Sequence, residues 1–140
     1  MLEAISAQDI AVSGLKAQRT RINVIANNIA NSQTTRTAEG RGPFRRQLVV
    51  LRGEPLEPHL DPRKFGVWVK RVLSDPSPPR LVYDPGHPDA DSEGYVAYPN
   101  VDVAMELVDL VSAQRAYDAN LAVIVSDKRM MQQALEIIRV

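Results

Sequence analysis

The sequence predicts an α+β fold in which long N- and C-terminal helices pack as a coiled-coil-like pair, with a small antiparallel β domain between them. All ten prolines lie between Pro43 and Pro99, and six of the seven glycines lie between Gly40 and Gly94, so both ends of the 140-residue chain are free of proline. Apolar residues recur every three or four positions in both ends, which is the period of an amphipathic helix. The middle has short runs of β-branched and aromatic residues between turn-forming ones, a pattern typical of antiparallel strands.

The first predicted unit is residues 1–35, a single helix of about 25 residues. A spacing of three and four selects Ile5, Gln8, Val12, Leu15, Arg19, Ile22, Ala26 and Ile29. Six of these eight residues are apolar, so they predict one buried stripe. Gly14 is the weak point of the helix, and the turn-forming stretch "NSQTTRTAEGRG" ends it.

The second predicted unit is residues 36–100, a small β domain with loops rich in proline and glycine. Four runs are predicted to be strands: "FRRQLVVLR", "FGVWVKRVL", "RLVYD" and "GYVAY". Three loop stretches separate them, namely "GEPLEPHLDPRK", "SDPSPP" and "PGHPDADSE". We expect the four strands to form one small antiparallel sheet.

The third predicted unit is residues 101–140, a helix of about 37 residues. The series Leu110, Tyr117, Ile124, Met131 and Ile138 is apolar at every seventh position, which is the coiled-coil period. Pro99 prevents an earlier start, and Asn100 or Asp102 offers an N-terminal cap. A β region of about 60 residues is too small to cover two long apolar stripes. The helices should therefore pack on each other and still leave apolar surface that needs further neighbours.

Composition excludes several classes of function. The net charge is zero, which argues against a nucleic-acid binder, and we expect the arginines of "RGPFRRQLVVLR" to pair with carboxylates. The absence of cysteine excludes thiol catalysis and thiolate metal sites. The N-terminal segment lacks the basic start of a cleaved signal peptide. The longest apolar run, Leu121 to Val125, is far too short for direct membrane insertion.

One loop has residues that resemble a chemical site. Asp84, His87, Asp89 and Asp91 lie within eight positions, and such groups bind divalent cations or act as acid and base. A metal-dependent hydrolase using the first three is therefore one hypothesis. The interleaved prolines and glycine favour a solvated turn instead, and no GxSxG, Walker, dinucleotide-binding or HExxH motif is present. We predict no catalytic residue, no cofactor and no metal.

Four asparagines interrupt the first helix near its end. Asn23, Asn27 and Asn31 are four apart and share one helix face, with Asn28 beside them. They form either a solvated polar face, or buried amides that reject wrong partners and registers at an interface. The residues alone favour neither interpretation.

Two stretches carry a resemblance to a known family. "VIANNIANSQTTRT" resembles the N-terminal signature of the bacterial flagellar rod and hook axial proteins. "VDLVSAQRAYDANLAVI", Val108 to Ile124, resembles their C-terminal signature, with Arg115, Ala116, Tyr117 and Asn120 in place. The stretches "GPFRRQLVVL" and "LVYDPGHPDADSEGYV" narrow the resemblance to a short component of the proximal rod. Residues 53–64 are the least recognisable part.

The resemblance implies a structural subunit of the proximal rod, the shaft that transmits motor torque across the periplasm to the hook and filament. Residues 1–35 and 101–140 would form the inner wall of a hollow tube, with the β domain outside. The implied partners are other rod proteins, further copies of this chain and surrounding basal-body components. Export would use the flagellum's own secretion apparatus, without a cleaved signal peptide. The alternative is a cytoplasmic coiled-coil adaptor.

Periodicity and resemblance together predict an assembly interface made of both terminal helices. Within it, the apolar residues of the first helix are expected to pack against those of the second, and the asparagines to be packed at a subunit junction. The predicted interface residues are Val12, Leu15, Ile22, Asn23, Asn27, Asn28, Ile29, Asn31, Leu110, Arg115, Tyr117, Asn120, Leu121, Ile124 and Met131.

Overall fold

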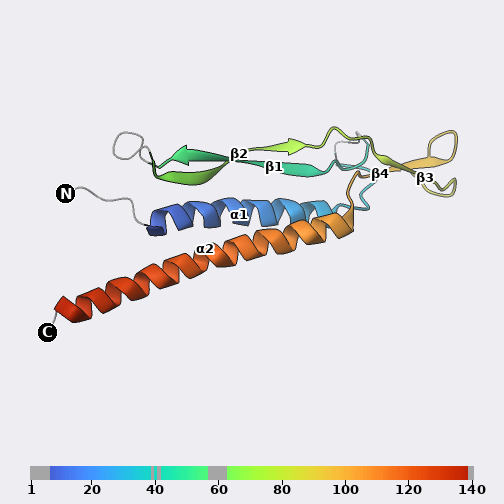
Figure 1. Ribbon diagram of the computed structural model, residues 1–140. Coiled ribbons are helices and arrows are strands. Elements are labelled where there is room, and N and C mark those ends of the chain that lie inside the picture. Colours follow the sequence, from blue (N-terminus) through green and yellow to red (C-terminus); the bar gives the residue numbers. More distant parts are fainter. Residues whose placement is uncertain (1–6, 39, 41, 57–62, 139–140) are drawn as a thin grey trace.

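The computed structural model describes residues 7–38, 40, 42–56 and 63–138. Two long helices enclose four strands in the sequence. Helix α1 spans Ala7–Ala30 and helix α2 spans Val103–Ile138, and they run antiparallel to each other (Figure 1). The predicted α+β class, with terminal helices packed together and an antiparallel β region between them, is confirmed.

Helix α2 begins where the sequence predicted a cap. The Asp102 carboxylate accepts the backbone N–H groups of Ala104 and Met105 at 2.9 and 3.3 Å. It thereby satisfies two of the four amides that a helix start leaves without partners. Asn100 has another role, because its side-chain oxygen accepts the backbone N–H of Arg46 at 2.9 Å.

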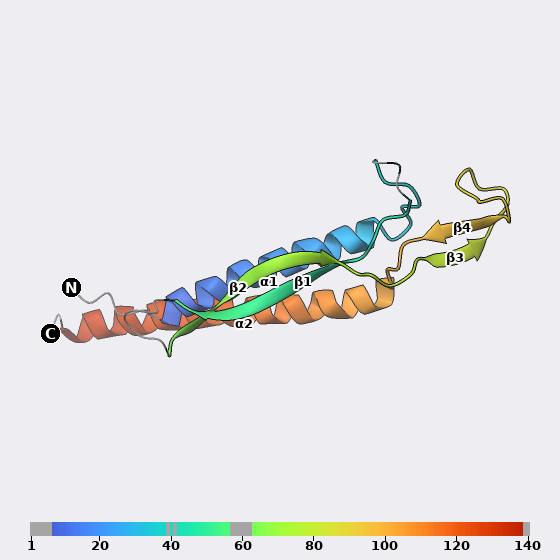
Figure 2. The same ribbon diagram turned by 90° about the horizontal axis from the view of Figure 1, so that it is seen from above.

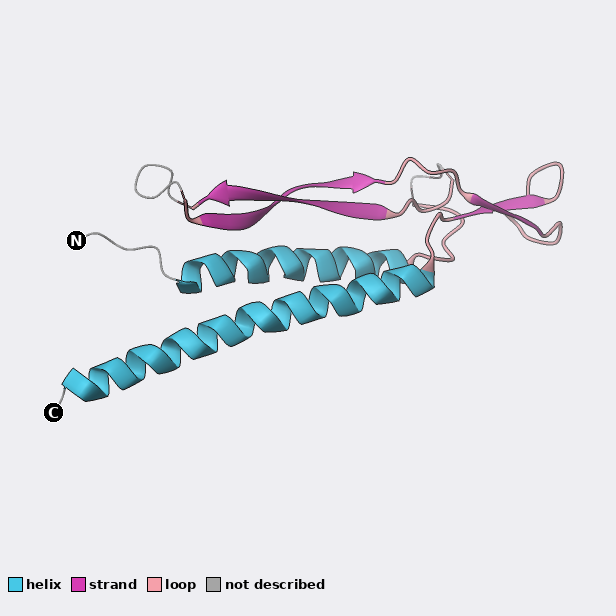
Figure 3. Ribbon diagram, viewed as in Figure 1, coloured by secondary structure: helices cyan, strands magenta, loops and turns pink. Residues whose placement is uncertain are grey.

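The strands form two separate hairpins (Figure 3). Strands β1 (Gln47–Pro55) and β2 (Phe65–Ser74) pair antiparallel, with Gln47 opposite Ser74 and an irregularity between Val50 and Leu51. Strands β3 (Arg80–Tyr83) and β4 (Tyr95–Tyr98) pair the same way, with Tyr83 opposite Tyr95. The expectation of one small sheet was therefore wrong. Four strand-like runs do not specify which strands are neighbours; here β1 pairs only with β2, and β3 only with β4.

The molecule has a layered arrangement with α1 in the middle. The β1–β2 hairpin packs along α1, and α2 packs on α1 as well (Figures 1 and 2). The Ser13 hydroxyl on α1 accepts the backbone N–H of Val67 on β2 at 3.0 Å and so links helix and hairpin. The β3–β4 hairpin lies beyond the end of the helix pair.

The contact between the helices is made of small and polar residues. Helical spacing places Gly14, Arg21, Ile25 and Asn28 of α1 on the side that faces α2, and Ala113 of α2 is fully buried. A Cβ atom on Gly14 would lie only 2.7 Å from the Asn120 Oδ1 atom. Gly14 thus leaves room for the Asn120 side chain of α2 to lie directly against α1.

This contact corrects the predicted packing within the chain. The stripe of Val12, Leu15, Ile22 and Ile29 was expected to face the tail helix, but its centre lies about a third of a turn away from that of the buried series. Val12 is exposed and the other three are half-buried. The small side chains on the face of α1 that contains Gly14 allow the backbones of α1 and α2 to approach closely. The bulkier apolar stripe therefore lies at the edge of the contact.

Candidate assembly interface

Asn28 occupies a buried junction between three elements. Its side-chain amide donates to the backbone carbonyl of Gln47 at 2.9 Å and to the Glu106 Oε2 atom at 3.0 Å. Its carbonyl oxygen accepts the Gln47 N–H at 2.8 Å. The side chain is 1% exposed, and these bonds meet the requirement that a buried amide be paired. Asn28 therefore joins α1 to the start of β1 and to α2.

Arg46 completes the junction by neutralising a buried carboxylate. Glu106 is 1% exposed, and its Oε1 atom accepts the Arg46 Nε–H at 2.5 Å. Arg46 also lies 3.5 Å from Asp109 and 3.7 Å from Asp75, and Arg21 reaches Asp109 at 3.3 Å. Burial opposes the charge on Arg46, but the hydrogen bond to Glu106 and the three carboxylates raise its pKa above the ordinary value. The expected pairing of this arginine with carboxylates takes place within the chain.

The other asparagines have mixed environments. Asn27 donates to the Gln47 side chain at 3.1 Å, and Asn31 donates to the backbone and side-chain oxygens of Asn27 at 2.9 and 3.0 Å. Asn23 is exposed and makes no side-chain hydrogen bond to any residue that the structure describes. Asn120 donates to the Ala116 carbonyl at 2.8 Å while its oxygen faces Gly14. The partners of Asn27, Asn28 and Asn31 in this structure belong to the same chain.

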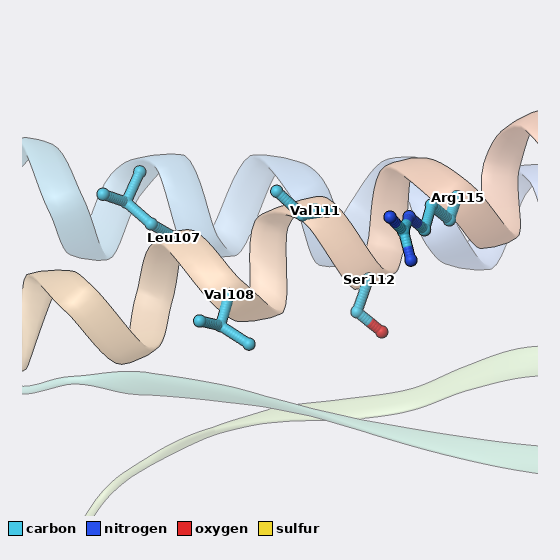
Figure 4. A pocket seen from close by; sticks show the side chains of 5 residues that line it. All are labelled: Leu107, Val108, Val111, Ser112 and Arg115. Carbon is cyan, nitrogen blue, oxygen red and sulfur yellow. The ribbon is translucent and has the colours of Figure 1, made fainter.

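The side of α2 that faces away from α1 is apolar and exposed. Leu107, Val108, Val111, Ser112 and Arg115 line a shallow surface groove of about 490 Å³ (Figure 4). Val108 is 65% exposed. Sequence reasoning placed Arg115 in the interface but assigned no groove to this face. We call these five residues the outer groove of α2.

The remaining predicted residues of α2 divide between two environments. Leu110, Tyr117 and Ile124 are half-buried beside α1, whereas Leu121 and Met131 are exposed. α2 is longer than α1 and continues past the first described turn of α1 (Figure 1). Its end carries further exposed apolar residues: Met130, Leu135, Ile137 and Ile138. Large exposed apolar patches on proteins mark interaction sites, and these residues are the candidates for one on α2.

The loop with the cluster of acids and histidine is held as a turn. Asp89 accepts the Thr35 hydroxyl at 2.8 Å and pairs with Arg36, and the Thr35 bond together with the Arg36 charge lowers its pKa. The His87 Nδ1 atom accepts the Asp89 N–H at 3.0 Å, and Asp91 accepts two backbone N–H groups. Within residues 7–38, 40, 42–56 and 63–138, no group of three or more acidic or histidine side chains is placed to hold a metal ion. Neither described helix is long and apolar enough to cross a membrane.

Two residues at the centre of this site were missed by sequence reasoning, Glu106 and Gly14. An isolated glycine within a helical pattern is a signal for close packing, so Gly14 was detectable. Glu106 was not detectable, because acidic residues are common in the first turn of surface helices, where they interact favourably with the helix dipole.

Comparison with known proteins identifies the family. A family model described as "Flagella basal body rod protein" matches residues 9–36, and another described as "Flagellar basal body rod FlgEFG protein C-terminal" matches residues 92–137. The flagellar basal-body rod protein FlgC of Borreliella burgdorferi is 45% identical, covering 96% of this chain and 97% of the relative. FlgC of Bacillus subtilis is 40% identical, covering 97% of this chain and 99% of the relative. FlgC of Salmonella typhimurium is 42% identical, covering 91% of this chain and 92% of the relative. The chain therefore belongs to the FlgC family of flagellar basal-body rod proteins.

Proposed function

We propose that this chain is a structural subunit of the proximal rod and that α1 and α2 form the wall of the shaft that carries motor torque. The observation that carries the proposal is the outer groove of α2, an apolar surface on a helix whose only packed neighbour among the described elements is α1. Such a surface needs further helices around it. In this arrangement residues 1–35 and 101–140 form the inner wall and residues 36–100 lie outside.

Torque transmission requires a subunit that does not shear internally. The junction of Asn28, Arg46 and Glu106 fixes α1, α2 and β1 to one another with charged and neutral hydrogen bonds. Buried polar contacts have strict geometry, so a slip of one helix along the other leaves several groups unpaired. We infer that this junction keeps the wall segment rigid under load.

The proposed contacts with neighbouring subunits use two surfaces. On α2 they include Arg115 in the outer groove and the exposed Leu121 and Met131. On α1 they include the exposed Val12 and Asn23, with Leu15, Ile22 and Ile29 at the edge of the internal contact. The neighbours are other rod proteins and further copies of this chain. Leu110, Tyr117, Asn120 and Ile124 support these contacts from the α1 side of α2.

The proposed location is the rod where it crosses the periplasm, with export through the flagellar secretion apparatus and no cleaved signal peptide. We assign the chain no catalytic activity. No observation favours the alternative of a cytoplasmic coiled-coil adaptor, since the relatives named above are basal-body rod proteins.

The experiment is complementation followed by purification of basal bodies. A strain that lacks its own copy of this protein should regain motility when the tagged chain is expressed, and the tag should copurify with rods. Intact N-terminal sequence of the incorporated chain would support export without cleavage. Motility that returns while the tag stays in the cytoplasm would contradict the proposal.

A further inference from the structure

The β3–β4 hairpin presents an open aromatic face at one end of the molecule. Tyr83 and Tyr95 are opposite each other on neighbouring strands, with ring centroids 5.3 Å apart. Strand alternation places Leu81 on the same face. Leu81 and Tyr83 are each 64% exposed, so this face has no cover among the described residues.

The opposite face of this hairpin is partly covered, although Val82 on it is 36% exposed. Val96 is fully buried, and the ring of Tyr98 lies 6.3 Å from that of His87 in the connecting loop. Thr35 and Arg36 tie the same loop to the chain after α1 through Asp89. The hairpin is therefore held in place, and the face with Leu81 and Tyr83 is the more open of the two. Two exposed acidic residues flank the hairpin strands, Asp84 after β3 and Glu93 before β4, and they pair with no described basic residue.

The β1–β2 hairpin presents the complementary surface. Along β2, Val67 and Val69 are half-buried while Trp68 and Lys70 are exposed, which is the alternation of a strand packed on one side. The irregularity in the pairing with β1 shifts the alternation by one residue, so Arg71 and Leu73, and not Val72, continue the outward face; both are exposed. Lys70 and Arg71 form no ion pair with any described residue. This face therefore combines the apolar Trp68 and Leu73 with the basic Lys70 and Arg71 between them.

We propose that the open face of the β3–β4 hairpin docks on the outward face of the β1–β2 hairpin of a second copy of this chain. The inference rests on the proposed assembly into a rod and names one contact within it. Leu81 and Tyr83 meet Trp68 and Leu73, and the acidic residues beside the one hairpin meet the basic residues of the other. Complementary charge next to apolar contacts selects a partner and fixes its orientation.

The positions of the hairpins favour a second copy as the partner. The β1–β2 hairpin lies along the helix pair, the β3–β4 hairpin lies beyond its end, and the two hairpins make no contact with each other within one chain (Figures 1 and 2). Each copy thus carries both complementary surfaces at different places. A contact between two different surfaces repeats from subunit to subunit and generates a ring or a helix.

Cysteine crosslinking tests this contact directly, because the natural chain contains no cysteine. Two differently tagged copies are coexpressed, one with Glu93→Cys and the other with Arg71→Cys, and purified basal bodies are oxidised. A product that carries both tags is expected, since a disulfide forms only between Cα atoms within about 7 Å. Coexpression of Ala38→Cys with Arg71→Cys is the matched control, because Ala38 is exposed but lies outside both faces.

Charge reversal provides the second measurement. Glu93→Lys or Arg71→Glu alone should lower the amount of chain in basal bodies by roughly tenfold, and the two together in one chain should restore it. If both cysteine variants enter basal bodies but no crosslinked product carries both tags, this inference is overturned and the proposed function is left intact. The same holds if the crosslink forms only to a different protein. Absence of even the unmodified tagged chain from basal bodies overturns both.

Discussion

Asn28 on α1 and Glu106 on α2 share a buried hydrogen bond of 3.0 Å, although 78 residues separate them in the sequence. The same carboxylate holds Arg46, which directly precedes β1. One cluster of polar groups thus joins both helices and the first hairpin. We expect the stability of the subunit to depend on this cluster more than on any single apolar contact between the helices.

Replacement of Asn28 tests the cluster from the α1 side. Asn28→Leu leaves the Gln47 N–H and one Glu106 oxygen without their partner, and each buried group so orphaned costs about 1–3 kcal/mol. We expect a loss of about 2–5 kcal/mol in the free energy of unfolding, measured by urea denaturation. The matched control is Asn23→Leu, which should change stability by less than about 0.5 kcal/mol because Asn23 is exposed. Equal effects of the two substitutions would contradict this role.

Arg46 and Glu106 should show strong coupling. Arg46→Met leaves a buried carboxylate without its closest cation, and Glu106→Met removes the acceptor of the Arg46 Nε–H. Loss of one partner of a fully buried pair costs about 3–5 kcal/mol, and the partial exposure of Arg46 lowers our expectation to about 2–3 kcal/mol. The double substitution should be less damaging than the sum of the single ones. Additive losses in a double-mutant cycle would show that the pair does not act as a unit.

Gly14 and Asn120 should be coupled through their close contact. Alanine in a helix is favoured over glycine by about 1 kcal/mol, but a Cβ atom on Gly14 would meet the Asn120 side chain. We expect Gly14→Ala to stabilise the Asn120→Ala variant by about that amount and to give less or no gain in the natural chain. Thermal unfolding of the four proteins measures this difference. The same gain in both backgrounds would mean that the helices do not approach closely here.

Acid should loosen the loop that joins β3 and β4. The hydrogen bond from Thr35 and the charge of Arg36 lower the pKa of Asp89 in the folded chain. A carboxylate of this kind stabilises the fold above its ordinary pKa of about 4, and that contribution is lost as the pH falls through the lower folded value. NMR signals of residues 84–94 should therefore shift below pH 4. Thr35→Val should move this change to higher pH, and an unchanged midpoint would contradict the assigned contact.

The sequence predicted elements better than it predicted contacts. The positions of the prolines and the recurrence of apolar residues every three or four positions located both helices, and the runs of β-branched residues located all four strands. These patterns are local properties of the chain. The face of α1 that contacts α2 was placed incorrectly, since an apolar stripe was preferred to one containing Gly14 and Asn28. Backbone approach at Gly14 and the buried Glu106 opposite Asn28 are relations between distant segments. Neither leaves a periodic signal in one segment alone.

The outer groove of α2 is the surface on which the proposed function depends, and its burial in the rod can be measured directly. A Val108→Cys variant is labelled with a thiol reagent as the purified chain and, separately, in intact basal bodies. Val108 is 65% exposed in the single chain, so the purified protein should react rapidly. Strong protection of the same cysteine in basal bodies is the result we predict. Equally fast labelling in both states would contradict the claim that this face of α2 is covered by neighbouring subunits.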